Sequence, residues 1–446
     1  MAELTILMVA ENEKEYVQLS LEALRLFAGV KDLAVVVVDN GSTDGLKEWA
    51  ATQNDFTYVY ADEGKMSFGE VVNQVRELLH IDTDLLIMDP HFMVAPGALQ
   101  DMQKVLHEEE SIGAVGGISN GFHGFQCLEG FEKFEDAVPA VEAKAKGRGK
   151  QVIGLCPEVV LLKAKVLNEL CELDGRFEDQ AFALKDLCFQ MVLKDIKLKV
   201  CETALFWEMR GNYYFADMNK ADDERLVDKW QMHYFNFVYN HHIVEQIQAV
   251  PGEEIHVLEI GCDCGATLLE IKNRHEGAKV YGYEINEKAA DIAAHFADVK
   301  TGNIEEENID FAGQKFDYII FGDVLEHLHN PLKTIQYCRN LLKPGGRIVS
   351  SIPNLMHISV IQDLLNGNFT YREVGLLDKT HIHMFTFNEI LSMFAQGGYQ
   401  VEKVEPVIYG ITKEQEELIP KLLALSPEAK EHMYKTFQYL VCARME

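Results

Sequence analysis

The chain has 446 residues, of which 48% are hydrophobic and 25% are charged, a composition typical of a globular protein. At this length two or three domains are expected, because one hydrophobic core rarely serves more than about 300 residues. The 71 acidic residues outnumber the 41 basic ones and give a formal net charge of −30. Nucleic acid is therefore not an expected partner, since its phosphates would be repelled over most of the surface.

Membrane insertion and secretion are not expected either. No apolar run approaches the roughly 20 residues that span a bilayer. The first residues, MAELTILMVAENEKE, lack the basic lead of a signal peptide and are expected to form a strand. The nine cysteines are scattered, with only Cys262 and Cys264 closely spaced. This usage suits the reducing cytoplasm better than a disulfide framework.

The first half of the chain alternates between strand and helix patterns, as parallel α/β architecture requires. In chain order we expect strands over residues 4–10, 33–39, 56–61 and 84–89, with helices between them over residues 16–27, 45–51 and 68–79. The strands are nearly continuous runs of Val, Ile and Leu. Such runs are typical of strands that are buried on both faces.

A second alternating segment follows a charged and aromatic stretch. Residues 216–250 are expected to form a helical connector that ends before Pro251-Gly252, so that the domains cover residues 1–215 and 251–446. In the second domain we expect strands over residues 256–261, 279–284, 316–323, 346–352, 399–409 and 436–445, and helices over residues 266–274, 287–296, 331–342 and 413–425. The fold class is thus α/β with two domains.

The second domain opens with a glycine turn in the stretch VLEIGCDCGATLLEI. Glu259, Gly261 and Gly265 lie where a strand passes into a helix, so the backbone can approach a ligand closely and the helix offers free N–H groups. The dinucleotide motif G-x-G-x-x-G is absent, which weighs against NAD. Glu284 ends the next strand, where a carboxylate can accept hydrogen bonds from both hydroxyls of a ribose.

Together with TGNIEEE, FDYIIFGD and LLKPGGRIV, these motifs resemble class I S-adenosylmethionine-dependent methyltransferases over residues 254–446. Asp263 departs from the pattern, since many relatives have glycine there. The resemblance implies S-adenosyl-L-methionine as cofactor. It places the following residues around it: Glu259, Gly261, Cys262, Gly265, Glu284, Ile285, Asn303, Ile304, Asp323 and His327.

Methyl transfer needs an aligned nucleophile and a group that removes its proton. The segments DVLEHLHNP, SSIPNLMH and GLLDKTHIHMFT look like the methyltransferases of bacterial polysaccharide and small-molecule pathways. They contain candidate bases, because imidazole titrates near neutral pH. His381, beside Asp378, is the first candidate, and His327, His357 and His383 are the others. Helix capping or packing is the alternative role for each histidine taken singly.

In the first domain, VVVVDNGSTDGLKEW places Asp39 at the carboxyl end of a buried strand, where ligands of open α/β sheets bind. A polar turn with a helix N-cap is the alternative reading. With MVAENE and the edge Asp89-Pro90-His91, the pattern resembles family-2 glycosyltransferases with the GT-A fold, over residues 2–230.

This second resemblance implies a nucleoside-diphosphate sugar of the UDP or GDP type as donor. The nucleotide-sugar residues would be Ala10, Glu11, Asn12, Asp39, Asn40, Asp62 and Asp89. The metal ligands would be Asp89, His91 and Glu208. Since His91 stands where relatives carry a carboxylate, Mn²⁺ is expected rather than Mg²⁺, which prefers oxygen ligands.

The aspartate that acts as general base in the glycosyltransferase pattern is not found at the matching position of this sequence. The stretch DGRFEDQAFALKDLCFQ puts Leu184 at the position of the usual aspartate, which leaves Asp179 and Asp186 as candidates. We expect an enzyme that transfers both a sugar and a methyl group to a glycan or glycoprotein acceptor. The alternative is a methyltransferase whose first domain is an inactive binding module.

Overall fold

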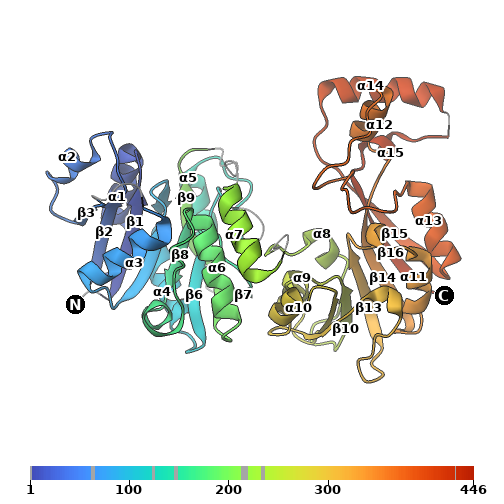
Figure 1. Ribbon diagram of the computed structural model, residues 1–446, viewed down its shortest axis with the longest axis horizontal. Coiled ribbons are helices and arrows are strands. Elements are labelled where there is room, and N and C mark those ends of the chain that lie inside the picture. The colour runs from blue at the N-terminus through green and yellow to red at the C-terminus, as the bar shows by residue number, and fades with distance from the viewer. Residues whose placement is uncertain are drawn as a thin grey trace. The chain divides into compact units, whose positions relative to one another are not determined.

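The computed structural model describes residues 3–61, 66–122, 126–144, 149–211, 219–232, 237–426 and 428–446. The chain divides into two compact units, Met1–Val238 and Tyr239–Glu446 (Figure 1). This division falls within the stretch expected to connect the domains. Among the described residues, no helix combines the length and hydropathy needed to cross a bilayer.

The first unit is built on a mixed sheet with the strand order β3-β2-β1-β4-β8-β6-β9-β5, and β7 pairs with β9. Its strands are β1 (Leu4–Ala10), β2 (Leu33–Asp39), β3 (Thr57–Tyr60), β4 (Asp84–Met88), β5 (Phe92–Val94), β6 (Ile112–Ile118), β7 (Lys150–Val152), β8 (Val159–Leu162) and β9 (Lys197–Glu208). The four strands from β3 to β4 are parallel, whereas β8 runs antiparallel to both of its neighbours. The carboxyl ends of β1, β2 and β4 therefore meet at one edge.

The helices of the first unit are α1 (Lys14–Phe27), α2 (Leu46–Ala50), α3 (Phe68–Leu79), α4 (Ala98–Leu106), α5 (Phe134–Glu142), α6 (Gln180–Val192) and α7 (Lys220–Trp230), with a π-helical turn η2 (Val166–Leu170). A capping box between Ser67 and Glu70 starts α3, because the two side chains satisfy each other's backbone N–H groups. Nine residues of α6 are buried. That burial follows because α6 packs against β9 of the sheet and against α3 and α7.

The second unit has a seven-stranded sheet with the order β12-β11-β10-β13-β14-β16-β15. Its strands are β10 (His256–Ile260), β11 (Lys279–Glu284), β12 (Asp298–Thr301), β13 (Phe316–Gly322), β14 (Leu342–Pro353), β15 (Tyr399–Val407) and β16 (Gln438–Met445). Strand β16 is the one strand of this sheet that runs antiparallel to the others, and it pairs antiparallel with both β14 and β15. The order reverses between β10 and β13, which creates the switch point where such sheets bind ligands.

Helices cover both faces of this sheet (Figure 1). They are α8 (His241–Val244), α9 (Ala266–Arg274), α10 (Glu287–Ala293), α11 (Pro331–Cys338), α12 (Ile358–Leu365), α13 (Phe387–Gln396), α14 (Lys413–Leu425) and α15 (Glu431–Lys435), with short 3₁₀ turns η3 (Ile304–Glu306) and η4 (Leu325–His327). One buried cluster includes residues of α8, α9 and α10, and the other includes residues of α11 and α13. Helices α12, α14 and α15 share a small core of their own around Ile358, Ile419 and Tyr434.

Candidate active sites

The glycine turn after β10 brings its backbone against neighbouring elements. Gly261 and Gly265 have positive φ angles of 68° and 85°. A Cβ on Gly261 would lie 2.7 Å from Val324, and one on Gly265 would lie 3.0 Å from Ala293. Asp263, between them, also has a positive φ of 46°. This conformation explains why glycine is usual at that position in the resembling family, since other residues adopt it at a cost.

Glu284 at the end of β11 is fixed against this turn. Its Oε2 accepts a hydrogen bond from the backbone N–H of Asp263 at 2.9 Å, and its Oε1 accepts one from Asn286 at 2.8 Å. The residue is buried. Because each carboxylate oxygen can accept a second hydrogen bond, both remain able to receive a hydroxyl.

Glu259 lies close to Glu284, and one of its carboxylate oxygens lacks a hydrogen-bond partner among the described residues. Its Oε2 is buried and has no hydrogen-bond partner among the described residues. Burial and the negative charges of Asp263 and Glu284 raise the pKa of Glu259 well above its ordinary value. A buried polar atom without a partner is rare in proteins and invites a ligand that donates to it. A cationic ligand would pair with the free oxygen of Glu259 and would also offset the negative charge of Glu259, Asp263 and Glu284.

The other expected cofactor residues divide by where their side chains lie. Ile285 is 70% exposed at the end of β11, whereas Ile304 is buried. The side chain of Asn303 accepts a hydrogen bond from Glu305 and so caps η3. Cys262 points into the core, where its Sγ is 2.6 Å from the position of a Cβ on Gly282. Only the backbone of Cys262 is therefore available to a ligand.

Asp323 follows β13 in a left-handed conformation, with a φ of 56°. Its backbone N–H donates to Ser351 Oγ at 3.0 Å, and its carboxylate accepts a hydrogen bond from Gln438. These contacts tie the end of β13 to β14 and β16. They hold the carboxylate at the same sheet edge as the glycine turn.

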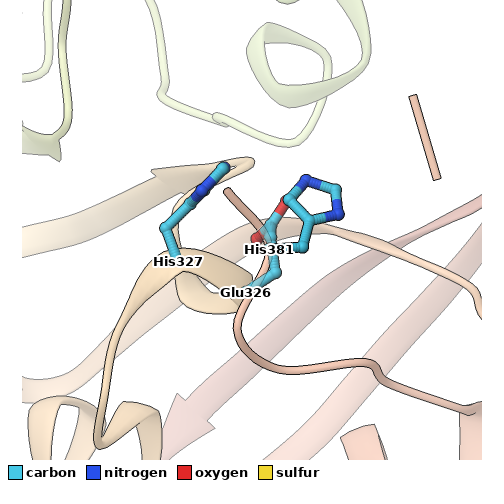
Figure 2. Close-up of side chains that lie close together, drawn as sticks. All are labelled: Glu326, His327 and His381. Atoms are coloured by element: carbon cyan, nitrogen blue, oxygen red, sulfur yellow. The ribbon is translucent and has the colours of Figure 1, made fainter. Parts of the chain in front are cut away.

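Three residues meet beside this edge (Figure 2): Glu326 and His327 on η4, and His381 on a neighbouring loop. The Nε2 of His381 is 4.0 Å from Glu326 Oε1. The two imidazole rings meet edge to face with centroids 4.8 Å apart. The structure thus brings together both histidines expected as bases. It adds Glu326, which sequence reasoning missed because a glutamate before a histidine in a helical turn carries no signal of burial.

In the first unit, Asp39 is fully buried at the end of β2. Its Oδ1 accepts a hydrogen bond from Ser42 N–H at 2.7 Å, and its Oδ2 accepts one from the Tyr58 hydroxyl at 2.6 Å. Burial and this carboxylate raise the pKa of Tyr58. Asp39 is therefore held rigidly at the sheet edge where the sequence placed it.

The two asparagines of this edge bind neighbouring backbone. Asn12 Oδ1 accepts from Thr43 N–H at 2.8 Å, and the Asn40 side chain pairs with the backbone of Met66. The Ala10 carbonyl accepts from Asn40 N–H at 2.9 Å, while Glu11 is exposed beside it. These contacts connect the loops after β1 and β2. Asp62 lies outside the described residues.

His91 lies between two carboxylates. Its Nδ1 is 2.7 Å from Asp89 Oδ1, and its Nε2 is 3.4 Å from Glu13 Oε1. The Tyr16 ring packs on the imidazole at 4.3 Å between centroids. Burial raises the pKa of Glu13 to about 7. Glu13 was not expected at this edge. Glu13 is the N-cap residue of α1, and the sequence does not show that the start of this helix lies beside His91.

Glu208, the expected third metal ligand, lies opposite Phe92 in the pairing of β5 with β9, and its side chain is engaged by Arg210. Arg210 Nε donates to Glu208 Oε1 at 2.6 Å, and Gly211 N–H donates to Oε2 at 2.9 Å. In the described parts of the chain, the one set of three converging ligand atoms is Glu326, His327 and His381. The expected set Asp89, His91 and Glu208 stays a prediction, and a bound ion would compete with Arg210 for the Glu208 carboxylate.

Asp186, one of the two expected candidate bases, lies in the interior of the first unit. It is fully buried in α6. Its Oδ1 accepts from Trp230 Nε1 at 2.8 Å and lies 2.7 Å from Lys229 Nζ, while Oδ2 accepts from Gln190. These contacts connect α6 to α7 and favour a structural role for Asp186, so its role as a base stays a prediction. Asp179, in contrast, is exposed and caps α6 through Ala181 N–H.

Glu158 is a further acid that the sequence did not indicate. Its backbone carbonyl accepts from Asp89 N–H at 2.8 Å, and its side chain is buried. Burial raises the pKa of Glu158 to about 7. It lies opposite Asp89 because β8 pairs antiparallel with β4, with Val159 beside Met88. No pattern in the chain shows that pairing.

Comparisons with known proteins agree with this architecture. Residues 5–169 match the family described as glycosyl transferase family 2, and residues 228–404 match the family described as methyltransferase domain. The ubiquinone biosynthesis O-methyltransferase of Coxiella burnetii (strain Dugway 5J108-111) is 30% identical over 174 residues, which are 37% of this chain and 71% of that protein. The mitochondrial enzyme of the same name from Dictyostelium discoideum is 24% identical over 39% of this chain and 58% of its own.

Among solved structures, a SAM-dependent methyltransferase from Archaeoglobus fulgidus aligns with 43% of this chain and 87% of its own, at 18% identity and a TM-score of 0.31. The two family matches lie on the two sheets in the order expected from the sequence. The chain therefore belongs to the S-adenosylmethionine-dependent methyltransferases through its second unit, and joins that unit to a family-2 glycosyltransferase domain.

Proposed function

We propose that the second unit transfers a methyl group from S-adenosylmethionine to a hydroxyl group of a glycan or of its carrier. The observation that carries this proposal is the pair of acids at the switch point. Glu259 presents a buried oxygen without a partner, and Glu284 presents two oriented oxygens beside it. S-adenosylmethionine supplies a methyl group on a positively charged sulfur and carries an ammonium group and a ribose.

The residues of the switch point suit that molecule part by part. The Oε2 of Glu259 would accept a hydrogen bond from the ammonium group, which also satisfies its negative charge. Glu284 would accept from the two ribose hydroxyls, and the turn from Gly261 to Gly265 would let the backbone approach the sugar. Ile285, exposed at the strand end, would cover the adenine.

The acceptor would enter next to Asp323 and η4. Glu326, His327 and His381 lie there, and burial together with the neighbouring His327 lowers the pKa of His381. A neutral imidazole can accept a hydrogen bond from a hydroxyl and orient its oxygen. We therefore place the reacting hydroxyl on the side of the two histidines.

For the first unit we propose transfer of a sugar from a nucleoside diphosphate. Its support is the polar edge formed by Asp39, the loop after β1 and Asp89, at the strand ends where α/β sheets bind nucleotides. Asp179 is the exposed acid that could take the proton of an acceptor hydroxyl. Joining the two units would raise the effective concentration of an intermediate that both modify. The scattered spacing of the cysteines in the sequence supports action in the reducing cytoplasm.

A methyltransferase with an inactive first unit is the second candidate. It is favoured by the ion pair between Glu208 and Arg210 and by the fully engaged Asp186. These contacts engage one expected metal ligand and one expected base. The first unit would then bind a nucleotide or glycan without reacting it.

Binding of S-adenosylhomocysteine, measured by calorimetry, tests the methyltransferase proposal. We expect Glu284→Gln to weaken binding about 10- to 100-fold, because hydrogen bonds to a charged group contribute about 1.5–3 kcal/mol. Glu287→Gln is the matched control, since Glu287 is exposed on the adjoining helix. An unchanged affinity in Glu284→Gln would contradict the proposed ribose contact.

Binding of UDP and GDP, with and without Mn²⁺, tests the first unit. Loss of metal-dependent binding in His91→Ala would support a donor site at Asp89-Pro90-His91 and justify a screen of donor sugars. Binding without turnover of any nucleotide sugar would support the inactive module. Absence of nucleotide binding would refute glycosyl transfer.

A further inference from the structure

We infer that Tyr409 binds a sugar ring of the methyl acceptor, and that this acceptor is a neutral oligosaccharide. This inference rests on the proposed methyl transfer and deepens it by naming the acceptor class and a residue that selects it. The observation that carries it is an aromatic ring held in place at the ligand edge of the second sheet. Tyr409 is 54% exposed and lies two residues beyond the end of β15 at Val407.

The direction of β15 places Tyr409 on the same edge as the methyl-donor site. Strands β14 and β15 both pair antiparallel with β16, so β15 runs parallel to β14 and to β13 (Figure 1). Its carboxyl end therefore lies at the sheet edge where Asp323 follows β13. The Val407 carbonyl accepts a hydrogen bond from Phe437 N–H at 2.9 Å, which ties the segment before Tyr409 to the start of β16.

Three rings in contact fix the position of Tyr409. Tyr409 and Phe437 meet edge to face, with centroids 5.0 Å apart and an interplanar angle of 75°. Phe437 meets the buried ring of His357 in the same way, with centroids 5.5 Å apart and an angle of 74°. Because its partner ring is anchored to the interior, Tyr409 has little side-chain freedom to lose when a ligand stacks on it.

A polar side chain beside these rings reaches the methyl-transfer site. Gln438 follows Phe437 at the start of β16, and its amide nitrogen donates to the Asp323 carboxylate. An aromatic face with a few polar side chains beside it is a common lining of ligand sites. A sugar ring suits this lining, since hydroxyl groups surround its rim and C–H groups cover its face. Those C–H hydrogens are attracted to the negative face of an aromatic ring.

The spacing of the strands indicates an acceptor with more than one sugar ring. Neighbouring strands lie about 4.8 Å apart, and β14 and β16 separate β13 from β15, so the ends of β13 and β15 lie about 14 Å apart. One sugar ring that presents a hydroxyl to the methyl donor near Asp323 does not reach Tyr409, whereas linked rings do. The family-2 glycosyltransferase domain on the same chain fits such an acceptor, because that family transfers sugars.

The charge of this edge selects among sugars. Glu259, Glu284 and Asp323 place three carboxylates at the carboxyl ends of neighbouring strands, and the whole chain has a formal net charge of −30. An acidic sugar would be repelled by this field. We therefore expect sugar rings without carboxylate or phosphate groups.

Saturation-transfer difference NMR on the full chain, with S-adenosylhomocysteine filling the donor site, tests this inference. The probes are maltose, cellobiose, lactose and mannobiose, each compared with the methyl glycoside of its non-reducing sugar. We expect at least one disaccharide to bind, and to bind more tightly than its methyl glycoside. Tyr409→Ala should weaken that binding about tenfold, whereas Tyr409→Phe should not change it, because the ring face makes the contact.

Tyr371→Ala is the matched control. Tyr371 is 53% exposed and meets Phe369 edge to face at 5.6 Å, so it resembles Tyr409 in exposure and packing but lies on the loop after α12. It should bind the disaccharide as the wild type does. Binding that is unchanged in Tyr409→Ala, or is weakened equally in both alanine variants, would overturn the inference.

S-adenosylhomocysteine binding, measured by calorimetry, separates the possible failures. Retained affinity in Tyr409→Ala shows that the variant is folded and that its methyl-donor site is intact. A wild type that binds S-adenosylhomocysteine but none of the sugars would overturn the role of Tyr409 alone. A wild type that binds no S-adenosylhomocysteine would overturn the proposed methyl transfer itself.

Discussion

Carboxylates that are shielded from water mark the binding edges of both units. Glu13 and Glu158 lie near Asp89 in the first unit, and Glu259 and Glu326 lie beside the switch point of the second. Desolvation destabilises a charged carboxylate and so raises its pKa. Keeping these carboxylates charged therefore costs free energy, and a bound cation or a proton lowers that cost. Shifted pKa values of this kind are common at functional sites.

For Glu158, this cost can be measured from the pH dependence of the free energy of unfolding. Its pKa of about 7 exceeds the ordinary 4.5, so the folded chain holds the proton more tightly than the unfolded chain does. Between these pH values the unfolded chain binds fewer protons, and the free energy of unfolding falls as pH rises. The contribution is unfavourable above pH 7 and vanishes below about pH 4.5.

We therefore expect Glu158→Gln to stabilise the first unit at pH 8 by on the order of 1–3 kcal/mol and to change little at pH 5. Thermal unfolding followed by circular dichroism at both pH values would measure this. Glu135→Gln is the control, because Glu135 is exposed. A Glu158→Gln protein that is less stable than the wild type at pH 8 would show that the charge is compensated.

At the scale of elements, strands and helices with strong local patterns matched their predictions. Strands β1 and β2 and helices α3 and α14 have the predicted bounds, because uninterrupted Val/Ile/Leu runs and capping residues define their ends locally. The prediction named no strand between Asp89 and the connector, where β5 to β9 form. Those strands are short or antiparallel, and their partners lie far away in the sequence.

The contact between α6 and α7 gives a test at this scale. Asp186→Asn would leave the partly buried Lys229 with Asp174 as its remaining carboxylate partner, and losing a hydrogen bond to a charged group costs about 1.5–3 kcal/mol. For a unit of this size we expect Tm to fall by about 3–12 °C. Asp228→Asn, on the exposed side of α7, should leave Tm unchanged.

Sugar transfer by these variants would test the role of Asp186 further. If Asp186 is structural, activity at a temperature well below Tm should persist. Loss of transfer together with an unchanged Tm would instead make Asp186 the catalytic base.

At the scale of the whole molecule, the chain consists of two units with separate cores. We expect two calorimetric unfolding transitions, each assigned by its ligand. S-adenosylhomocysteine at 100 times its Kd adds about 2.7 kcal/mol to the unit that binds it. It should therefore raise one Tm by about 5–10 °C and leave the other unchanged.

UDP or GDP should raise the other transition if the first unit binds a nucleotide. A single transition that shifts as a whole with either ligand would contradict the independence of the two units. The experiment needs no variant, so a folding defect cannot imitate the result.

The sequence alone determined the two α/β domains, their families and the residues at strand ends, such as Asp39, Glu259 and Glu284. These follow from local patterns, since periodicity, turns and strand-end motifs involve residues close together in the chain. Tertiary structure decided which acids act together. It paired Asp186 with Lys229 and placed His381 beside Glu326. Burial and charge pairing depend on segments that meet only after folding, so no local pattern could reveal them.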